Sequence, residues 1–248
     1  MIARYSALLL LSLALPAQAA EIKVLSGNGA RAAVLELVAR FDRASGHRTS
    51  VEFAVNPQTR KKIESGQAFD VAILNPPQLN ELIKQKLIVA ETRSVLGRAG
   101  IGVGIREGAP KPDISSVEAF KRTLLGAKAV AYPGEGASGK YFVSVVERLG
   151  IAAEMKPKMR PMPAEYNVEV VATGEADLVV VVASRISGVP GVKLAGTIPQ
   201  ELQTWIGFTG GVSSAAREPQ AAREMLRFMT SPAAAPVLKA TGIEPFVE

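Results

Sequence analysis

The chain has 248 residues, one histidine and no cysteine, and its formal net charge is +6 at pH 7. The lack of cysteine excludes disulfide bonds and thiol chemistry, and a lone histidine does not make a transition-metal cluster, so we expect no metal and no cofactor. The lysines and arginines are scattered rather than gathered in a tract with interleaved aromatic residues, which argues against nucleic acid as a partner.

The first residues are typical of a secretory signal peptide. Arg4 precedes an apolar run over residues 7–15, and the small-x-small sequence Ala17-Gln18-Ala19 follows, which predicts a signal peptide over residues 1–19 that is cleaved after about Ala19. The apolar run is too short to cross a bilayer, and no later stretch approaches about 18 uninterrupted apolar residues. We therefore expect a soluble, exported protein.

Residues 21–41 predict a strand, a tight turn and a helix. A β-branched apolar run over residues 22–25 is followed by Ser-Gly-Asn-Gly at 26–29, and apolar residues then recur at helical spacing over 34–41. Such a turn points the first N–H groups of the helix beyond the carboxyl end of the strand, where they favour an anion. An ordinary N-cap turn is the alternative. The candidate ligand-binding residues here are Ser26, Gly27, Asn28 and Arg31.

The same pattern of strand, polar turn and helix returns along the chain. Further strands are predicted at residues 49–55, 69–74, 94–106, 128–132, 157–163, 176–183, 192–195 and 205–213. Further helices are predicted at residues 60–65, 78–86, 117–125, 140–149, 164–173, 219–230 and 232–241. Strands that alternate with helices in this way predict an α/β fold with a parallel sheet.

Two later polar turns supply most of the other candidate ligand-binding residues. The turn predicted at residues 56–59 and the helix start after it contribute Asn56, Gln58, Thr59 and Arg60. The glycine-rich stretch before the helix at 140–149 contributes Ala137, Ser138, Gly139 and Lys140. This stretch has the glycine-lysine spacing of a nucleotide phosphate loop, but Tyr141 stands where Ser or Thr would hold magnesium. We therefore expect N–H groups here to bind a carboxylate or oxyanion rather than a nucleotide.

Three cations lie in or near first helical turns, where a positive charge opposes the helix dipole. They are Arg31, Arg60 and Lys140. Solvated surface cations would explain this placement equally well. If the three cations face a ligand, they suit a di- or tricarboxylate, because planar guanidinium groups match carboxylates.

The remaining polar residues divide into structural groups and one candidate for the site. Asp70 and Asp177 flank predicted strands, and we expect them to cap or pair structurally. His47 lies in a polar loop, and we expect it at the surface. Glu165, beside Tyr166 at a predicted helix start, is the carboxylate that we expect near a ligand.

In their order along the chain, these features resemble the periplasmic molybdate-binding proteins, which are type 2 solute-binding proteins of ABC importers. The resemblance rests on the signal peptide, the Ser26 turn, and a series of short matches spread over nearly the whole mature chain. These matches are Phe53-Ala54, Ile63-Glu64-Ser65-Gly66, Phe69-Asp70-Val71, Tyr141, Leu149-Gly150, Gly174-Glu175-Ala176 and Ser231-Pro232-Ala233-Ala234.

That family implies a two-lobed α/β fold with two crossing segments between the lobes. Residues 20–95 and 205–248 would form the first lobe, and residues 96–204 the second. The resemblance further implies a monomer in the periplasm that binds a small anion in the interlobe cleft and delivers it to the membrane component of an ABC importer. Tyr166, beside Glu165, is a further candidate ligand-binding residue.

Two departures from the family favour a di- or tricarboxylate over molybdate. The family holds tetrahedral oxyanions through a serine in the first turn, a serine-rich second turn and a tyrosine after an apolar strand. In this chain, Ser26 provides the serine of the first turn. Residues 55–59 are Val-Asn-Pro-Gln-Thr, in which proline supplies no N–H, and Val182 occupies the position that we match to the tyrosine.

An enzyme on the same scaffold is the alternative to a binding protein. The periplasmic aconitate isomerases look like molybdate-binding proteins, and a proton shift on a tricarboxylate needs a cationic cleft with one base or a serine network. The candidate catalytic residues would be Ser26, Ser138, Glu165 and Tyr166. We prefer the binding protein, because it needs no catalytic base.

Overall fold

The computed structural model describes residues 19–163, 166 and 168–245. Its strands are β1 (Glu21–Gly27), β2 (Arg48–Ala54), β3 (Val71–Leu74), β4 (Ser94–Arg106), β5 (Val130–Pro133), β6 (Met159–Met162), β7 (Leu178–Val182), β8 (Val192–Thr197), β9 (Trp205–Val212) and β10 (Glu244–Pro245). Its α-helices are α1 (Arg31–Ser45), α2 (Asn56–Glu64), α3 (Pro76–Lys84), α4 (Val117–Gly126), α5 (Ala137–Arg148), α6 (Ala152–Met155), α7 (Glu169–Thr173), α8 (Pro219–Met229) and α9 (Ala235–Ala240). Two short 3-10 helices also matter below, η1 (Asn28–Ala30) and η4 (Ala183–Arg185).

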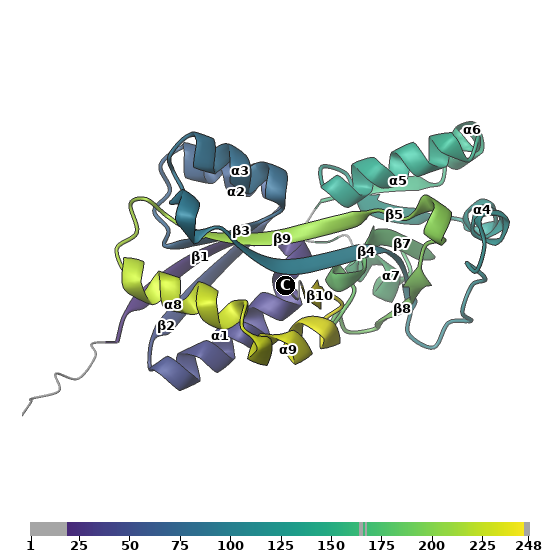
Figure 1. Cartoon of the computed structure of the whole chain (residues 1–248). Helices are drawn as coiled ribbons and strands as arrows, with labels where there is room; N and C mark the ends of the chain where they lie inside the picture. Colours follow the sequence, from purple (N-terminus) through teal and green to yellow (C-terminus); the bar gives the residue numbers. More distant parts are fainter. Residues whose placement is uncertain (1–18, 164–165, 167, 246–248) are drawn as a thin grey trace, which may run out of the picture.

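Two long strands are shared by the two halves of the molecule. The first lobe contains β1–β3 with α1–α3, α8 and α9, and the second contains β5–β8 with α4–α7 (Figure 1). β4 pairs antiparallel with β9 over residues 94–100 and with β7 and β8 over residues 101–106. β9 pairs in turn with β3. The expected α/β fold with two lobes and two crossing segments is confirmed. Since β4 continues across residues 95 and 96, the exact lobe boundaries stay a prediction.

Alternation along the strands explains how the sheet of the first lobe is covered on both faces. Ile22 and Val24 of β1 are buried in the cluster that includes the apolar faces of α1 and α8. Leu25 points the other way, into a cluster with apolar residues of α2 and α3. All four residues of β3 are buried, as expected for a parallel strand with helices on both faces.

The carboxyl ends of the parallel strands lie at the edge of each lobe where the helices begin. β1 is parallel to both β2 and β3, and β5 is parallel to both β6 and β7. The segments η1, α2, α5 and η4 directly follow β1, β2, β5 and β7. This arrangement gathers the helix starts from both lobes in one region.

The polar turn predicted at residues 56–59 is wrong, because these residues form the first turn of α2. Pro57 is the second residue of that helix. Proline is compatible with a first helical turn, since the N–H that it lacks would have no partner within the helix.

The helix predicted at residues 164–173 is shorter in the structure, where α7 covers Glu169–Thr173. Residues 164, 165 and 167 lie outside the described part of the chain, as do residues 1–18 of the signal peptide predicted over residues 1–19. Across the described ranges, no helix combines the length and apolar character needed to span a membrane.

His47 is more enclosed than its loop sequence predicts. Its side chain is 10% exposed, and its Nε2 lies 3.7 Å from the Glu224 carboxylate. The backbone N–H of Ala20 donates to His47 Nδ1 over 3.1 Å, and the imidazole packs against the Phe41 ring. The surface prediction for His47 is therefore wrong, because tertiary packing covers the loop.

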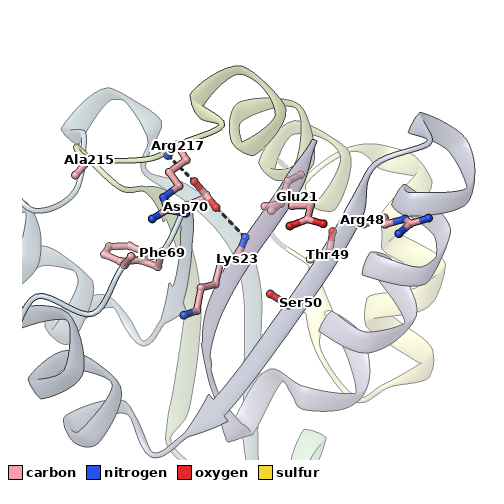
Figure 2. A pocket seen from close by; sticks show the side chains of 11 residues that line it. Glu21, Lys23, Arg48, Thr49, Ser50, Phe69, Asp70, Ala215 and Arg217 are labelled. Carbon is pink, nitrogen blue, oxygen red and sulfur yellow. Dashed lines mark hydrogen bonds between the residues drawn. The ribbon is translucent and has the colours of Figure 1, made fainter. Parts of the chain in front are cut away.

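Asp70 joins three segments at the amino-terminal edge of the first lobe (Figure 2). Its side chain is buried, and its carboxylate accepts the backbone N–H groups of Lys23 at 2.8 Å, Arg217 at 2.8 Å and Glu218 at 3.2 Å. These contacts connect β1, the start of β3 and the chain before α8. Asp70 therefore has the structural role that its position predicts.

Asp70→Asn should lower the free energy of unfolding by about 1–3 kcal/mol, because an amide nitrogen would face buried N–H donors that the carboxylate now satisfies. Urea denaturation of the purified protein measures this loss. Asp177→Asn is the matched control, since Asp177 also accepts two backbone N–H groups but is exposed, where water can replace it. Equal losses in the two variants would contradict the role given to Asp70.

Candidate functional site

A small cavity of about 50 Å³ lies between the lobes, at the carboxyl ends of the parallel strands. We call it the interlobe cavity. The first lobe contributes Asn28, Gly29, Val55 and Asn56, and β9 contributes Ile206 and Phe208. The second lobe contributes Pro133, Gly136, Ala137, Ser138, Val182 and Arg185. The cavity therefore draws on the ends of β1, β2, β5 and β7 together.

Three helical segments begin at the interlobe cavity. η1 begins at Asn28, α2 at Asn56 and α5 at Ala137, and in none of them does the N-cap side chain cap the first turn. Helical geometry leaves the first N–H groups without partners within the helix. Because α2 and α5 are full helices, their positive ends also favour negative charge. The cavity is thus suited to an anion.

Polar side chains add donors beside these helix starts. Asn56 uses its Oδ1 to accept the N–H of Asn75 at 2.9 Å, and none of the described residues accepts from its Nδ2. Ser138 is buried, and its hydroxyl likewise has no protein partner in the described part of the chain. Both groups are available to a ligand oxygen.

The sequence analysis missed Arg185, the cation in the wall of the interlobe cavity. Arg185 is 7% exposed, and its Nη2 donates to Glu169 Oε1 over 2.7 Å. Its Nε is buried and has no hydrogen-bond partner within the described structure. An unsatisfied buried donor costs about 1–3 kcal/mol, so a ligand oxygen that accepted from Nε would recover that cost. The signal was available, since Ser184-Arg185 comes directly after an apolar strand.

Glu169 is the carboxylate partner of this buried arginine. Burial acts to raise the pKa of Glu169, but hydrogen bonds from Arg185 and from backbone N–H groups, together with the charge of Arg185, outweigh it and lower the pKa overall. Glu169 therefore stays ionised at neutral pH. The pair neutralises part of the arginine charge without using its Nε.

Four of the residues predicted from sequence line the interlobe cavity: Asn28, Asn56, Ala137 and Ser138. Two other predicted residues, Gly27 and Gly139, are next to these residues in the chain and allow close packing instead of lining the cavity. A Cβ on Gly27 would lie 2.8 Å from the Asn56 side chain, and a Cβ on Gly139 would lie 1.7 Å from the carbonyl oxygen of Pro133. Gly139 is therefore required by its contact with backbone, whereas a side chain at position 27 would displace the Asn56 amide.

Two predicted hydroxyl groups make local backbone contacts. Ser26 lies in β1 rather than in the turn, is fully buried, and donates from Oγ to its neighbour Gly27 O at 3.2 Å. Thr59 is buried in α2 and donates to Val55 O at 3.3 Å. The structure brings neither hydroxyl into the wall of the cavity.

The other predicted residues also lie outside the interlobe cavity. Gln58 donates to Glu135 across the lobes at 3.1 Å, Arg60 pairs with Glu64 at 3.3 Å, and Lys140 is exposed. The hydroxyl of Tyr166 donates to Glu175 Oε1 at 2.8 Å. Glu165 falls outside the described residues. Arg31 lies in the wall of a different cavity and stacks on the Phe53 ring, with its guanidinium carbon 4.5 Å from the ring centroid.

A larger cavity of about 450 Å³ lies at the opposite, amino-terminal edge of the first lobe (Figure 2). Lys23 and Arg217 line it, but the Asp70 carboxylate between them is already occupied by backbone N–H groups. Helix starts follow the carboxyl ends of strands rather than their amino ends, so this cavity lacks their N–H donors. We therefore place the candidate site in the smaller interlobe cavity.

The described residues contain no group of three or more histidine, cysteine, aspartate or glutamate side chains arranged to hold a metal ion. The polar groups of the candidate site are backbone N–H groups, the side-chain amides of Asn28 and Asn56, the Ser138 hydroxyl and the Arg185 guanidinium. These donors recognise oxygen atoms that carry negative charge.

Comparison with known proteins agrees with this geometry. An aconitate isomerase from Pseudomonas sp. is 32% identical over 230 residues, which cover 90% of this chain and 87% of that protein. The molybdate-binding protein ModA of Rhodobacter capsulatus is 25% identical over 240 residues, which cover 94% of this chain and 92% of that protein. The expected resemblance to molybdate-binding proteins is confirmed.

Solved structures show the fold. The periplasmic molybdate-binding protein of Azotobacter vinelandii superposes with a TM-score of 0.78 at 17% identity, covering 91% of this chain and 100% of that chain. The sulfate-binding protein SubI of Mycobacterium tuberculosis superposes with a TM-score of 0.69 at 15% identity, covering 91% and 87%. The fold is that of the type 2 periplasmic binding proteins.

The sequence profile of one family spans almost the whole described chain. The profile for bacterial extracellular solute-binding proteins matches residues 22–244, which include both lobes, both crossing strands and every residue that lines the interlobe cavity. This protein therefore belongs to the family of bacterial extracellular solute-binding proteins.

Proposed function

We propose that this protein captures a small anion in the interlobe cavity, prefers a di- or tricarboxylate, and delivers it to an ABC importer. The observation that carries the proposal is the buried Arg185 with its unpaired Nε beside the starts of η1, α2 and α5. A guanidinium that already pairs with one carboxylate, Glu169, has the geometry to take a second. Molybdate is the less favoured ligand.

The cellular setting belongs to the same proposal. Export to the periplasm is supported by the signal pattern over residues 1–19 and by the family to which the chain belongs. Delivery to an importer is supported by the likeness to molybdate-binding proteins. The interlobe cavity measures only about 50 Å³ and is lined by both lobes, so we expect the lobes to separate when ligand enters and leaves.

Arg185→Gln should weaken binding of a tricarboxylate such as tricarballylate by about 10- to 100-fold, because a charge-assisted hydrogen bond contributes about 1.5–3 kcal/mol. Isothermal titration calorimetry of the wild type and the variant measures the change. Arg160→Gln is the control, because Arg160 is an exposed arginine of the same lobe outside the cavity. Unchanged affinity in Arg185→Gln would remove this residue from the ligand site.

An aconitate isomerase is the second candidate, and the 32% identity to such an enzyme over 90% of the chain favours it. The reaction moves a proton between two carbon atoms and needs a group that carries it. Within the described lining of the cavity, Ser138 supplies a hydroxyl. Glu169 is near, but its lowered pKa makes it a weak base. The cavity chemistry thus supports binding more directly than catalysis.

Incubation of the purified protein with cis- or trans-aconitate, followed by proton NMR, separates the two candidates. We expect binding of the tricarboxylate without interconversion. Interconversion that is lost in Ser138→Ala, while ligand binding persists, would contradict the transport binder and support the isomerase. Ser144→Ala in the same helix is the control, because the Ser144 hydroxyl bonds to the Tyr141 carbonyl outside the cavity.

A further inference from the structure

A second cavity of about 240 Å³ lies beside the start of α1, where the two lobes meet. We call it the Arg31 cavity. Arg31 and Ala32 line it from the first lobe, and Glu169, Ser184, Arg185 and Ser187 line it from the second. Arg185 also lines the interlobe cavity, so one guanidinium group is part of both walls.

A hydrogen bond between the lobes links the two cavities. The Ser184 hydroxyl donates to the Gly29 carbonyl oxygen over 2.7 Å. Ser184 lines the Arg31 cavity, and Gly29 lines the interlobe cavity. This bond therefore holds η4 to η1 between a residue of each wall, and η4 also contains Arg185, which lines both cavities.

The Arg31 cavity carries an excess of positive charge. Its charged side chains are two guanidinium groups, Arg31 and Arg185, and one carboxylate, Glu169, which bonds to Arg185. No carboxylate of the described chain pairs with Arg31. The Arg31 guanidinium is oriented by stacking on the Phe53 ring. Its positive charge lies in the first turn of α1, where it opposes the helix dipole. An anion in this cavity would offset that charge.

The sizes of the two cavities point to a ligand with separated charges. The interlobe cavity, at about 50 Å³, has room for a few water-sized groups, which suits one anionic group. The Arg31 cavity is several times larger, and the exposed Arg31 forms part of its wall. A compact tetrahedral oxyanion would occupy one of the two spaces, whereas an extended polycarboxylate has charges for both.

We propose that the Arg31 cavity is a second carboxylate subsite for the same ligand. One carboxylate lies in the interlobe cavity at Arg185 and the helix starts, and the distal carboxylate lies at Arg31. Glu169 positions the shared Arg185 between them. The inference rests on the proposed function and narrows its ligand to di- or tricarboxylates whose carboxylates are separated by two or more carbon atoms.

Calorimetry with ligands whose outer carboxylates are separated by one carbon atom (malonate), two (succinate) or three (glutarate and tricarballylate) tests the subsite. Malonate, succinate, glutarate and tricarballylate are titrated into the wild type, Arg31→Ala and Arg31→Lys. For Arg31→Ala we expect an affinity loss of less than about twofold for malonate, which is too short to reach both sites, and of about 10- to 100-fold for glutarate and tricarballylate. Arg31→Lys should recover part of that loss, because it keeps the charge but not the planar fork.

Controls on the same helix separate recognition from folding. Arg43→Ala removes an exposed arginine from the last turn of α1 and should leave every affinity unchanged. The Arg31→Ala substitution takes a cation away from the positive end of α1. The melting temperature of this variant should therefore not fall below that of the wild type. The melting temperature of each variant is measured beside its affinity.

The outcomes distinguish the subsite from the proposed function. Tricarballylate binding that is unchanged in Arg31→Ala overturns the subsite and leaves the proposed function standing. An equal loss for all ligand lengths overturns it too, because Arg31 would then act on the whole cleft. If the wild type binds molybdate but none of the carboxylates, the subsite is overturned while anion capture survives. If it binds no anion, both are overturned.

Discussion

The antiparallel pairing of β4 with β9 is the constraint on which the rest of this structure depends. β4 contributes its first half to the sheet of the first lobe and its second half to the sheet of the second. Because the two lobes share these strands, the parallel strands of both lobes direct their carboxyl ends toward one region (Figure 1). The junction of β4 and β9 is reinforced by Gln203, whose side-chain amide exchanges two hydrogen bonds with the backbone of Ile101.

The glycines of β4 follow from the same constraint. A Cβ on Gly102 would lie 2.8 Å from Leu194 of β8, and one on Gly104 would lie 2.6 Å from Val179 of β7. β4 pairs with both of these strands over its second half, so its surface has no room for side chains at these positions. By themselves, the alternate glycines predict only a β-like segment. The structure explains them by the close packing of β4 against its neighbouring strands.

Electrostatics then distinguishes the two ends of the first lobe. At the amino ends of the strands, Asp70 satisfies three N–H groups and holds the chain together. At the carboxyl ends, helix starts without side-chain caps meet a buried arginine whose single carboxylate partner leaves Nε unpaired. At the amino-terminal edge the N–H groups around Asp70 are already hydrogen-bonded and have a structural role. At the carboxyl-terminal edge, hydrogen-bond donors remain that a ligand can satisfy. A buried cation with spare hydrogen-bonding capacity is costly in a free protein, and that cost is consistent with a role in ligand recognition.

The sequence by itself determined the α/β class, because strand and helix periodicity and strand-end turns are local patterns. It also carried the family resemblance, and that resemblance implied the two crossing segments. The sequence also indicated Asn56 and Ser138, which lie in the first turns of the helices that come after β2 and β5. Only the tertiary structure decided which polar groups meet. Ser26 has the residue type of a ligand but points into the core, since the strand extends one residue past it. Arg185 and Glu169 are sixteen residues apart and pair only because the tertiary fold brings η4 and the start of α7 within hydrogen-bonding distance. Side-chain direction, burial and pairing across the lobes depend on long-range packing, and no local pattern contains that information.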